Sequence, residues 1–279
     1  MSTESKIGVG VKLSIQIVNF RSRHYLERCL FSIWENLPAI LHTEVIIINN
    51  DEEPLDRATA DIGSGLAVQI VEIGKNIGFG SAHNAGFRQS RGEYILLLNP
   101  DAKIAPSVLD KMLGVFAEDE KIGIVGPLLV DSVGQVQPDC FGAHRTPLST
   151  IKNKIFGRRE RQALAGEKAF KTDWVSGGSM MIRRDVFEKT GGFDENFFMY
   201  FEDVDLCARA RKSGSIVAIH PAARIFHESG KSFSSEQEKK KHYYASQDYY
   251  TKKHFGSVGA SFVKLLRFPY YVKNVYLNR

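Results

Sequence analysis

The chain has 279 residues, of which 43% are hydrophobic and 25% charged, an ordinary globular composition that allows one large domain or two small ones. Its three scattered cysteines form no CxxC pair, which argues against a disulfide framework or a zinc cluster. No apolar run approaches the roughly 18 residues of a transmembrane helix, and no signal peptide is recognisable, so we expect a cytoplasmic protein.

The net charge of +5 is concentrated at the C-terminal end of the chain. From Lys231 to Arg279 there are ten Lys or Arg residues against three Asp or Glu, and aromatic residues are interleaved with them. This composition is typical of a segment on an anionic membrane surface, and we expect peripheral contact with the inner face of the plasma membrane. A solvated helical face is the main alternative, and we expect no nucleic acid partner, although the composition would suit one.

Five strand-length apolar segments follow one another in the first 130 residues, at 12–20, 44–50, 67–74, 93–102 and 122–130. Apolar residues recur at helical spacing in two of the intervening segments, 24–38 and 105–120. Solid apolar strands that alternate with helices predict an α/β fold with a mostly parallel sheet and helices on both of its faces.

Polar residues follow three of these strands. Asn19 ends the first, Asn49 and Asn50 end the second, and Asn99 and Asp101 follow the fourth. Any one of them is as readily explained as a turn or cap residue. Because open α/β sheets bind ligands beyond the carboxyl ends of their strands, three such ends at one edge indicate a binding site.

A glycine-rich segment, residues 75–92, lies between the third and fourth strands. Gly78 and Gly80 begin a GxGxxG-like pattern, but its third glycine would fall at His83, which argues against a dinucleotide-binding dehydrogenase. The segment predicts a turn where the backbone approaches a nucleotide closely, followed by a short helix with Asn84 in its first turns.

The motifs IVNF, VIIINN, NIGFGSAHNAG, LLLNPDA, a long segment at 174–214 and HESGKS occur in one order along the chain. This ordered set resembles the family 2 glycosyltransferases with the GT-A (nucleotide-diphospho-sugar transferase) fold, and within them the bacterial rhamnosyltransferases. The resemblance covers roughly residues 12–235. It implies a GT-A domain over residues 10–235, followed by a basic, aromatic helical extension over residues 236–279.

The resemblance also implies a donor site with a divalent metal, Mn²⁺ or Mg²⁺. The DxD-type motif reads Asn99-Pro100-Asp101, so Asp101 is an implied metal ligand and His227 of HESGKS a further one. Asn49 and Asn99 stand where family members commonly have Asp, so the donor site has two fewer negative charges. We therefore expect donor binding to depend less on the metal. The implied nucleotide and donor contacts are Asn19, Asn49, Asn50, Gly78, Gly80, Asn84, Asn99, Lys231 and Ser232.

Glu202 and Asp203 resemble the ED motif that supplies the catalytic base of the family. We expect Asp203 to take the proton of the acceptor hydroxyl and Glu202 to orient the acceptor or the metal shell. An acidic N-terminus on a well-capped helix would by itself explain the same residues. Trp174, Gly177 and Gly178 are the expected acceptor contacts, and we place the neighbouring Tyr200 in a packed aromatic loop outside the site.

The expected function is therefore inverting transfer of a hexose from a nucleotide-sugar donor. L-Rhamnose from dTDP-L-rhamnose is the leading donor, and the acceptor is a glycan or a lipid-linked sugar in cell-envelope polysaccharide synthesis. A non-catalytic sugar-nucleotide or glycan-binding module and a nucleotidyltransferase are the alternatives. The sequence also allows a homodimer.

Overall fold

The computed structural model describes residues 11–38, 41–56, 59, 66–147, 164, 166–228 and 235–272. Up to residue 130 its elements are β1 (Leu13–Asn19), α1 (Arg23–Asn36), β2 (Thr43–Asn49), β3 (Ala67–Glu72), α2 (Phe79–Phe87), β4 (Tyr94–Leu98), β5 (Ala102–Lys103), α3 (Val108–Glu118) and β6 (Ile122–Val130). Beyond it are β7 (Phe141–Gly142), β8 (Phe170–Thr172), β9 (Trp174–Val175), β10 (Ser179–Arg183), α5 (Arg184–Thr190), α6 (Glu202–Lys212), β11 (Ile216–His227) and α7 (Glu236–Val272).

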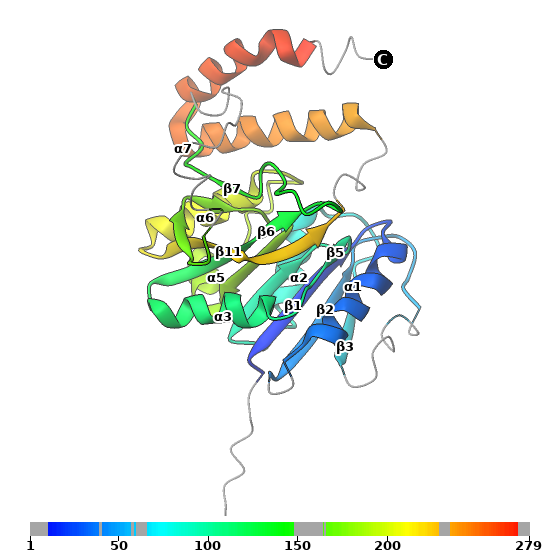
Figure 1. The fold of residues 1–279 in the computed structure, drawn as a ribbon. Coiled ribbons are helices and arrows are strands. Elements are labelled where there is room, and N and C mark those ends of the chain that lie inside the picture. The colour runs from blue at the N-terminus through cyan, green and yellow to red at the C-terminus, as the bar shows by residue number, and fades with distance from the viewer. Residues whose placement is uncertain are drawn as a thin grey trace, which may run out of the picture.

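One large sheet organises the described residues (Figure 1), with the strand order β3-β2-β1-β4-β10-β6-β11-β5 and β8 added beside β11. The strands β3, β2, β1 and β4 are mutually parallel, as are β6 and β11, whereas β10 runs antiparallel between β4 and β6. The predicted mostly parallel sheet is confirmed. The ends of β1, β2 and β4 lie together at its carboxyl edge, where the polar residues after these strands predicted a binding site.

Helices cover both faces of the sheet, as predicted. In β2, Val45 and Ile47 join the core cluster that includes Leu30 of α1. The alternate residues Ile46 and Ile48 pack instead with Ala82 of α2, because successive side chains of a strand point to opposite faces. Burial on both faces explains why β2 and β4 are solid apolar runs rather than alternating ones.

The predicted C-terminal helical extension is α7, which contains two helices joined at Gly256. Gly256 has φ 73° and ψ 179°, a conformation that suits glycine and ends the first helix. We call residues 236–255 the inner helix and residues 257–272 the outer helix. Figure 1 shows the outer helix stacked on the inner one, on the side away from the sheet. None of the helices in the described segments is long and apolar enough to cross a bilayer.

The inner helix packs against the rest of the described fold. Tyr250 is fully buried in the main core cluster. The Ser246 hydroxyl donates to the Met199 carbonyl at 2.7 Å, and His254 Nε2 lies 2.8 Å from the buried Asp205 carboxylate. These contacts fix the inner helix against the segment that leads into α6.

Candidate active site

A cavity of about 540 Å³ lies at the carboxyl edge of the sheet. Its walls come from the segments after β1, β2 and β4, the turn between β9 and β10, the start of α6, the end of β11 and the inner helix. Nine residues predicted for the site line it: Asn50, Asn99, Asp101, Trp174, Gly177, Gly178, Glu202, Asp203 and His227.

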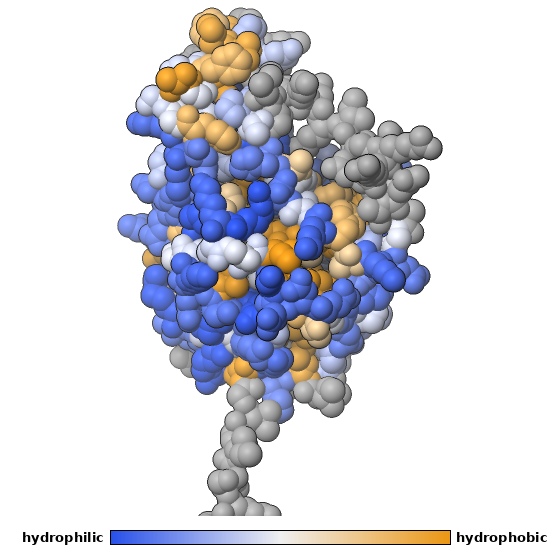
Figure 2. Space-filling view, turned by 90° about the vertical axis from the view of Figure 1, so that its left-hand side faces the viewer, coloured by the Kyte–Doolittle hydropathy of each residue, from blue (hydrophilic) through white to orange (hydrophobic). Residues whose placement is uncertain are grey.

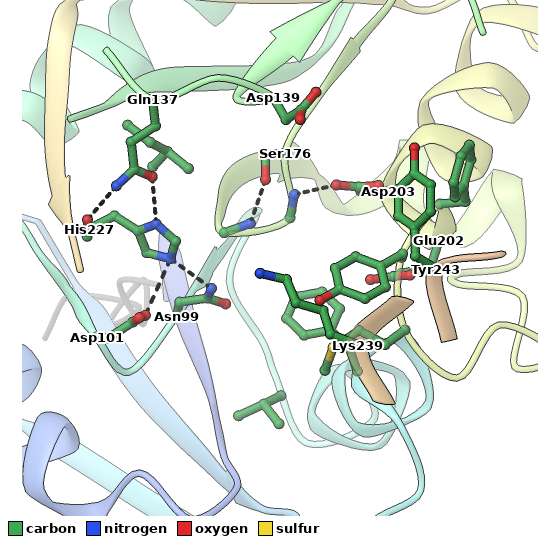
Figure 3. A pocket seen from close by; sticks show the side chains of 18 of the residues that line it. Asn99, Asp101, Gln137, Asp139, Ser176, Glu202, Asp203, His227, Lys239 and Tyr243 are labelled. Carbon is green, nitrogen blue, oxygen red and sulfur yellow. Dashed lines mark hydrogen bonds and ion pairs between the residues drawn. The ribbon is translucent and has the colours of Figure 1, made fainter. Parts of the chain in front are cut away.

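One group in the cavity consists of Asn99, Asp101 and His227 (Figure 3). The antiparallel pairing of β11 with β5 sets His227 opposite Ala102 and so beside Asp101. His227 Nε2 lies 3.0 Å from Asn99 Nδ2 and 3.3 Å from Asp101 Oδ1. Two strand ends that are 128 positions apart in sequence therefore form one polar cluster.

Gln137 fixes the orientation of the His227 ring. Gln137 Nε2 donates to the His227 carbonyl at 2.6 Å, and Gln137 Oε1 lies 2.9 Å from His227 Nδ1. The proton is thereby assigned to Nδ1, and Nε2 presents a lone pair toward Asn99 and Asp101. Sequence reasoning did not anticipate Gln137.

This arrangement fits a divalent cation. An unprotonated ring nitrogen and a carboxylate oxygen 3.3 Å apart both present electron pairs, a contact that a bound cation would stabilise. Within the described segments no three His, Cys, Asp or Glu residues group as a metal site, so Asp101 and His227 leave most of the coordination shell open. Mg²⁺ and Mn²⁺ commonly complete such a shell with substrate phosphates and water.

Replacing Gln137 by Leu is expected to weaken divalent-metal affinity by roughly 10- to 100-fold, because the ring of His227 loses the acceptor that sets its tautomer. The measurement is a Mn²⁺ titration followed by donor binding. Gln135→Leu is the matched control, since Gln135 is an exposed residue of the nearby turn outside the cavity. Equal affinities in the two variants would contradict the orienting role of Gln137.

The second group surrounds Asp203 at the start of α6. Asp203 Oδ2 accepts a hydrogen bond from the Gly177 amide at 2.9 Å, and Oδ1 accepts one from the Val204 amide at 2.7 Å. A Cβ at position 177 would come within 2.9 Å of the Phe79 ring, so glycine permits this close approach. Tyr200 and Phe201 precede the helix at φ 71° and 67°, and this strained turn aims Asp203 into the cavity.

Glu202 differs from Asp203 in its environment. Its side chain is buried, and its Oε2 atom has no hydrogen-bond partner among the described residues. Burial raises the pKa of Glu202 well above its usual value, and the charge of Asp203 adds to the rise. Both residues line the cavity, but the enclosed Oε2 atom of Glu202 is out of reach of a bound substrate, whereas Asp203 is half-buried there.

The raised pKa of Glu202 predicts a pH-dependent stability. Because the folded state holds this proton more tightly than the unfolded chain, its contribution is present at acid pH and is lost as the pH rises through the folded pKa. Glu202→Gln should therefore gain thermal stability relative to the unsubstituted chain over the pH range above the usual glutamate pKa of about 4. Thermal melts across this range test it, with the exposed Glu120→Gln as control; parallel curves for Glu202→Gln and the unsubstituted chain would contradict it.

Several predicted donor residues brace the cavity without lining it. Asn19 Nδ2 donates to Asn49 Oδ1 at 2.8 Å, and Asn49 Nδ2 donates to Glu72 Oε2 at 2.6 Å. A Cβ on Gly78 would come within 2.5 Å of the Phe198 carbonyl oxygen, and one on Gly80 would meet the Phe193 side chain. These contacts hold three strand ends and the glycine-rich turn in place.

Asn84 also serves the framework around the cavity. Its Nδ2 donates to the Phe193 carbonyl and its Oδ1 accepts from the Phe193 amide, both at 2.9 Å. Trp174 is buried, and its Nε1 donates to the Ala143 carbonyl at 3.1 Å, although part of the residue lines the cavity. Lys231 and Ser232 lie outside the described residues.

The cavity includes cationic and aromatic residues that sequence reasoning missed. Arg145 packs over the Trp174 ring at 4.9 Å, and burial lowers its pKa. Lys239 and Tyr243 extend into the cavity from the inner helix (Figure 3), and Tyr200 also lines it. For Lys239 and Tyr243 the only sequence signal was the basic, aromatic composition that we interpreted as a surface property.

Comparison with known proteins agrees with this geometry. Residues 11–245 match the sequence profile of the family described as glycosyltransferase-like family 2. The chain belongs to this family. The match extends past residue 235 into α7, in keeping with the contribution of the inner helix to the cavity.

Relatives of this family 2 chain include proteins named as rhamnosyltransferases, which confirms the resemblance. An N-acetylglucosaminyl-diphospho-decaprenol L-rhamnosyltransferase of Mycobacterium tuberculosis is 30% identical over 179 residues, 57% of this chain and 58% of that protein. The dTDP-rhamnosyl transferase RfbF of Shigella flexneri is 28% identical over 190 residues, 67% of this chain and 60% of that protein. The chain thus matches less than two thirds of the length of either relative.

Solved structures confirm the GT-A fold. The mannosyltransferase PcManGT of Pyrobaculum calidifontis, in complex with GDP-Man and Mn²⁺, superposes with a TM-score of 0.65 at 16% identity, covering 95% of this chain and 73% of that one. GalNAc-T7 with UDP, GalNAc and Mn²⁺ gives a TM-score of 0.65 at 15% identity, covering 97% of this chain and 57% of that one.

Proposed function

We propose that this family 2 member is an inverting, metal-dependent glycosyltransferase that acts at the cytoplasmic face of a membrane. Its donor is dTDP-L-rhamnose, and its acceptor is a glycan or lipid-linked sugar of cell-envelope polysaccharide synthesis. The observation that carries the proposal is the coexistence, in one cavity, of a cation-binding pair and a separately held carboxylate. Rhamnose is supported by the relatives named as rhamnosyltransferases.

The donor half of the site is the group around Asp101 and His227. These two residues would hold Mn²⁺ or Mg²⁺, which neutralises charge on the leaving nucleoside diphosphate. Asn99 offers a neutral amide beside them, so the protein contributes one carboxylate rather than two. Lys239 extends into the cavity from the inner helix, 3.5 Å from Glu236, and would add a cation beside the diphosphate.

The acceptor half of the site is Asp203 and its surroundings. The acceptor hydroxyl oxygen attacks the anomeric carbon, the bond from that carbon to the diphosphate oxygen breaks, and Asp203 takes the hydroxyl proton. The Gly177 and Val204 amides hold the carboxylate in one orientation for this transfer. A single displacement of this kind inverts the anomeric configuration and requires no covalent enzyme intermediate.

A donor screen tests the proposal. The purified chain is melted with dTDP-rhamnose, UDP-glucose, UDP-GlcNAc, GDP-mannose and the free nucleoside diphosphates, in Mn²⁺ and in EDTA. We expect the largest Mn²⁺-dependent stabilisation with dTDP-rhamnose, because a ligand that binds only the folded state raises the melting temperature. Stabilisation by another sugar nucleotide would replace the donor, and none by any of them would overturn the proposal.

A further inference from the structure

The outer helix has one buried face, and that face packs on the inner helix. Its buried residues Ala260, Val263 and Arg267 recur at helical spacing. Arg267 Nη1 donates to Gln247 Oε1 at 2.7 Å and Arg267 Nη2 to Asp248 Oδ2 at 2.6 Å, so the contact is specific. The outer helix is thus fixed to the inner helix through this face.

The opposite face of the outer helix is apolar and exposed. Val258, Phe262 and Leu265 have exposed fractions of 85%, 43% and 74%. The spacing of three and four residues from position 258 through 262, 265, 266 and 269 places a continuous stripe opposite the buried face. We call this set the apolar stripe: Val258, Phe262, Leu265, Leu266 and Pro269.

This concentration of exposed apolar side chains is unusual in the molecule. Of the nine large hydrophobic residues exposed among the described residues, six lie in the outer helix. Figure 2 shows the corresponding apolar surface at the end of the molecule formed by α7. Contiguous exposed apolar surface marks an interaction site more often than scattered single residues do.

Charge identifies the partner. From Tyr249 to Arg279 the chain carries six Lys or Arg residues and no Asp or Glu. Lys253 pairs with Asp194 and Asp205 and Arg267 with Asp248, whereas Lys252 is exposed. Lys264 lies within the outer helix with 59% of its side chain exposed, and it shares the single carboxylate of Asp248 with Arg267. Cations and aromatic residues around an apolar helical stripe match an anionic lipid surface.

A second copy of the chain fits this surface less well. A twofold contact through the stripe would bring the same cationic segment of each copy together. That segment carries no acid to pair with the added cations. An anionic bilayer accepts both the apolar stripe and the charge around it.

We propose that the outer helix docks on an anionic bilayer by inserting the apolar stripe between the lipid head groups. The inner helix beneath it carries Lys239 and Tyr243 into the cavity, so the bilayer would lie about one helix diameter, roughly 10 Å, beyond that wall. This position suits a lipid-linked acceptor, and that part of the inference rests on the proposed function. Docking itself does not depend on it.

The test is sedimentation of the full chain with vesicles of phosphatidylglycerol and phosphatidylcholine, compared with pure phosphatidylcholine vesicles. We expect binding to the anionic vesicles that weakens in high salt. Leu265→Asp should lower the vesicle affinity about tenfold or more, because it removes a large inserted apolar side chain and adds a repelled charge. Val133→Asp is the matched control, since Val133 has the same exposed fraction of 74% and belongs to the turn after β6 rather than to α7.

The outcomes separate docking from its alternatives. Unchanged vesicle binding by Leu265→Asp, or no binding by the unsubstituted chain, overturns the proposal. Sedimentation of the chain without vesicles shows whether it forms a dimer. If the chain does not bind vesicles and Leu265→Asp dissociates a dimer, the apolar stripe would be assigned to contact with a second copy. Donor stabilisation without vesicles reports separately on the proposed function, and melting of each variant verifies its fold.

Discussion

Replacing Asp203 by Asn is expected to lower kcat by roughly 10²- to 10⁴-fold while leaving donor affinity nearly unchanged. The amide has almost the same shape, and its oxygen still accepts the hydrogen bond that the Gly177 amide gives to Asp203 Oδ2, although its NH2 group cannot accept the bond from the Val204 amide. It cannot accept the proton of the acceptor hydroxyl, so the loss falls on the chemical step. Release of nucleoside diphosphate in the presence of an acceptor-containing membrane extract measures it.

Glu202→Gln is the comparison for this variant, because the two acids are neighbours with opposite surroundings. Burial of Glu202 and the raised pKa that follows predict a much smaller loss of kcat. The reverse ranking, with Glu202→Gln inactive and Asp203→Asn active, would transfer the role of base to Glu202.

Replacing Asp101 by Ala is expected to weaken Mn²⁺-dependent donor binding by more than roughly 100-fold. This exceeds the effect expected for Gln137, which only orients a ligand. Asp101 is the carboxylate beside His227 Nε2, at 3.3 Å, so its removal leaves one protein ligand. Donor titrations in Mn²⁺ and in EDTA measure the effect.

In EDTA the Asp101→Ala variant and the unsubstituted chain should bind the donor alike. Asp110→Ala removes an exposed acid of α3 outside the cavity and serves as the control. A Mn²⁺ enhancement that survives in Asp101→Ala would contradict the assignment of this residue to the cation.

Local sequence patterns predicted the framework and the edge at which the site lies. The solid apolar runs of β2 and β4 reflect burial on both faces and can be recognised within each strand alone. The polar residues that end them share one edge because the strands are parallel. The meeting of Asp101 with His227 depends on the pairing of β11 with β5, and only the family resemblance anticipated it.

The remaining site residues depend on contacts that no local pattern encodes. Gln137 follows β6 in a segment without periodicity, and its importance appears only through its bonds to His227. Lys239 and Tyr243 belong to a segment whose composition suggested a surface helix. The break at Gly256 allows one half of α7 to wall the cavity while the other half presents the apolar stripe. The predicted boundary at residue 235 and the homodimer stay predictions.

The most direct measurement of the division of labour in the cavity is calorimetric titration of dTDP-rhamnose, in Mn²⁺, into the unsubstituted chain, Asp203→Asn and Asp101→Ala side by side. We predict that Asp203→Asn keeps the donor affinity of the unsubstituted chain and that Asp101→Ala loses it. Equal loss in both variants, or retained affinity in Asp101→Ala, would contradict the assignment of one side of the cavity to the donor and the other to proton transfer.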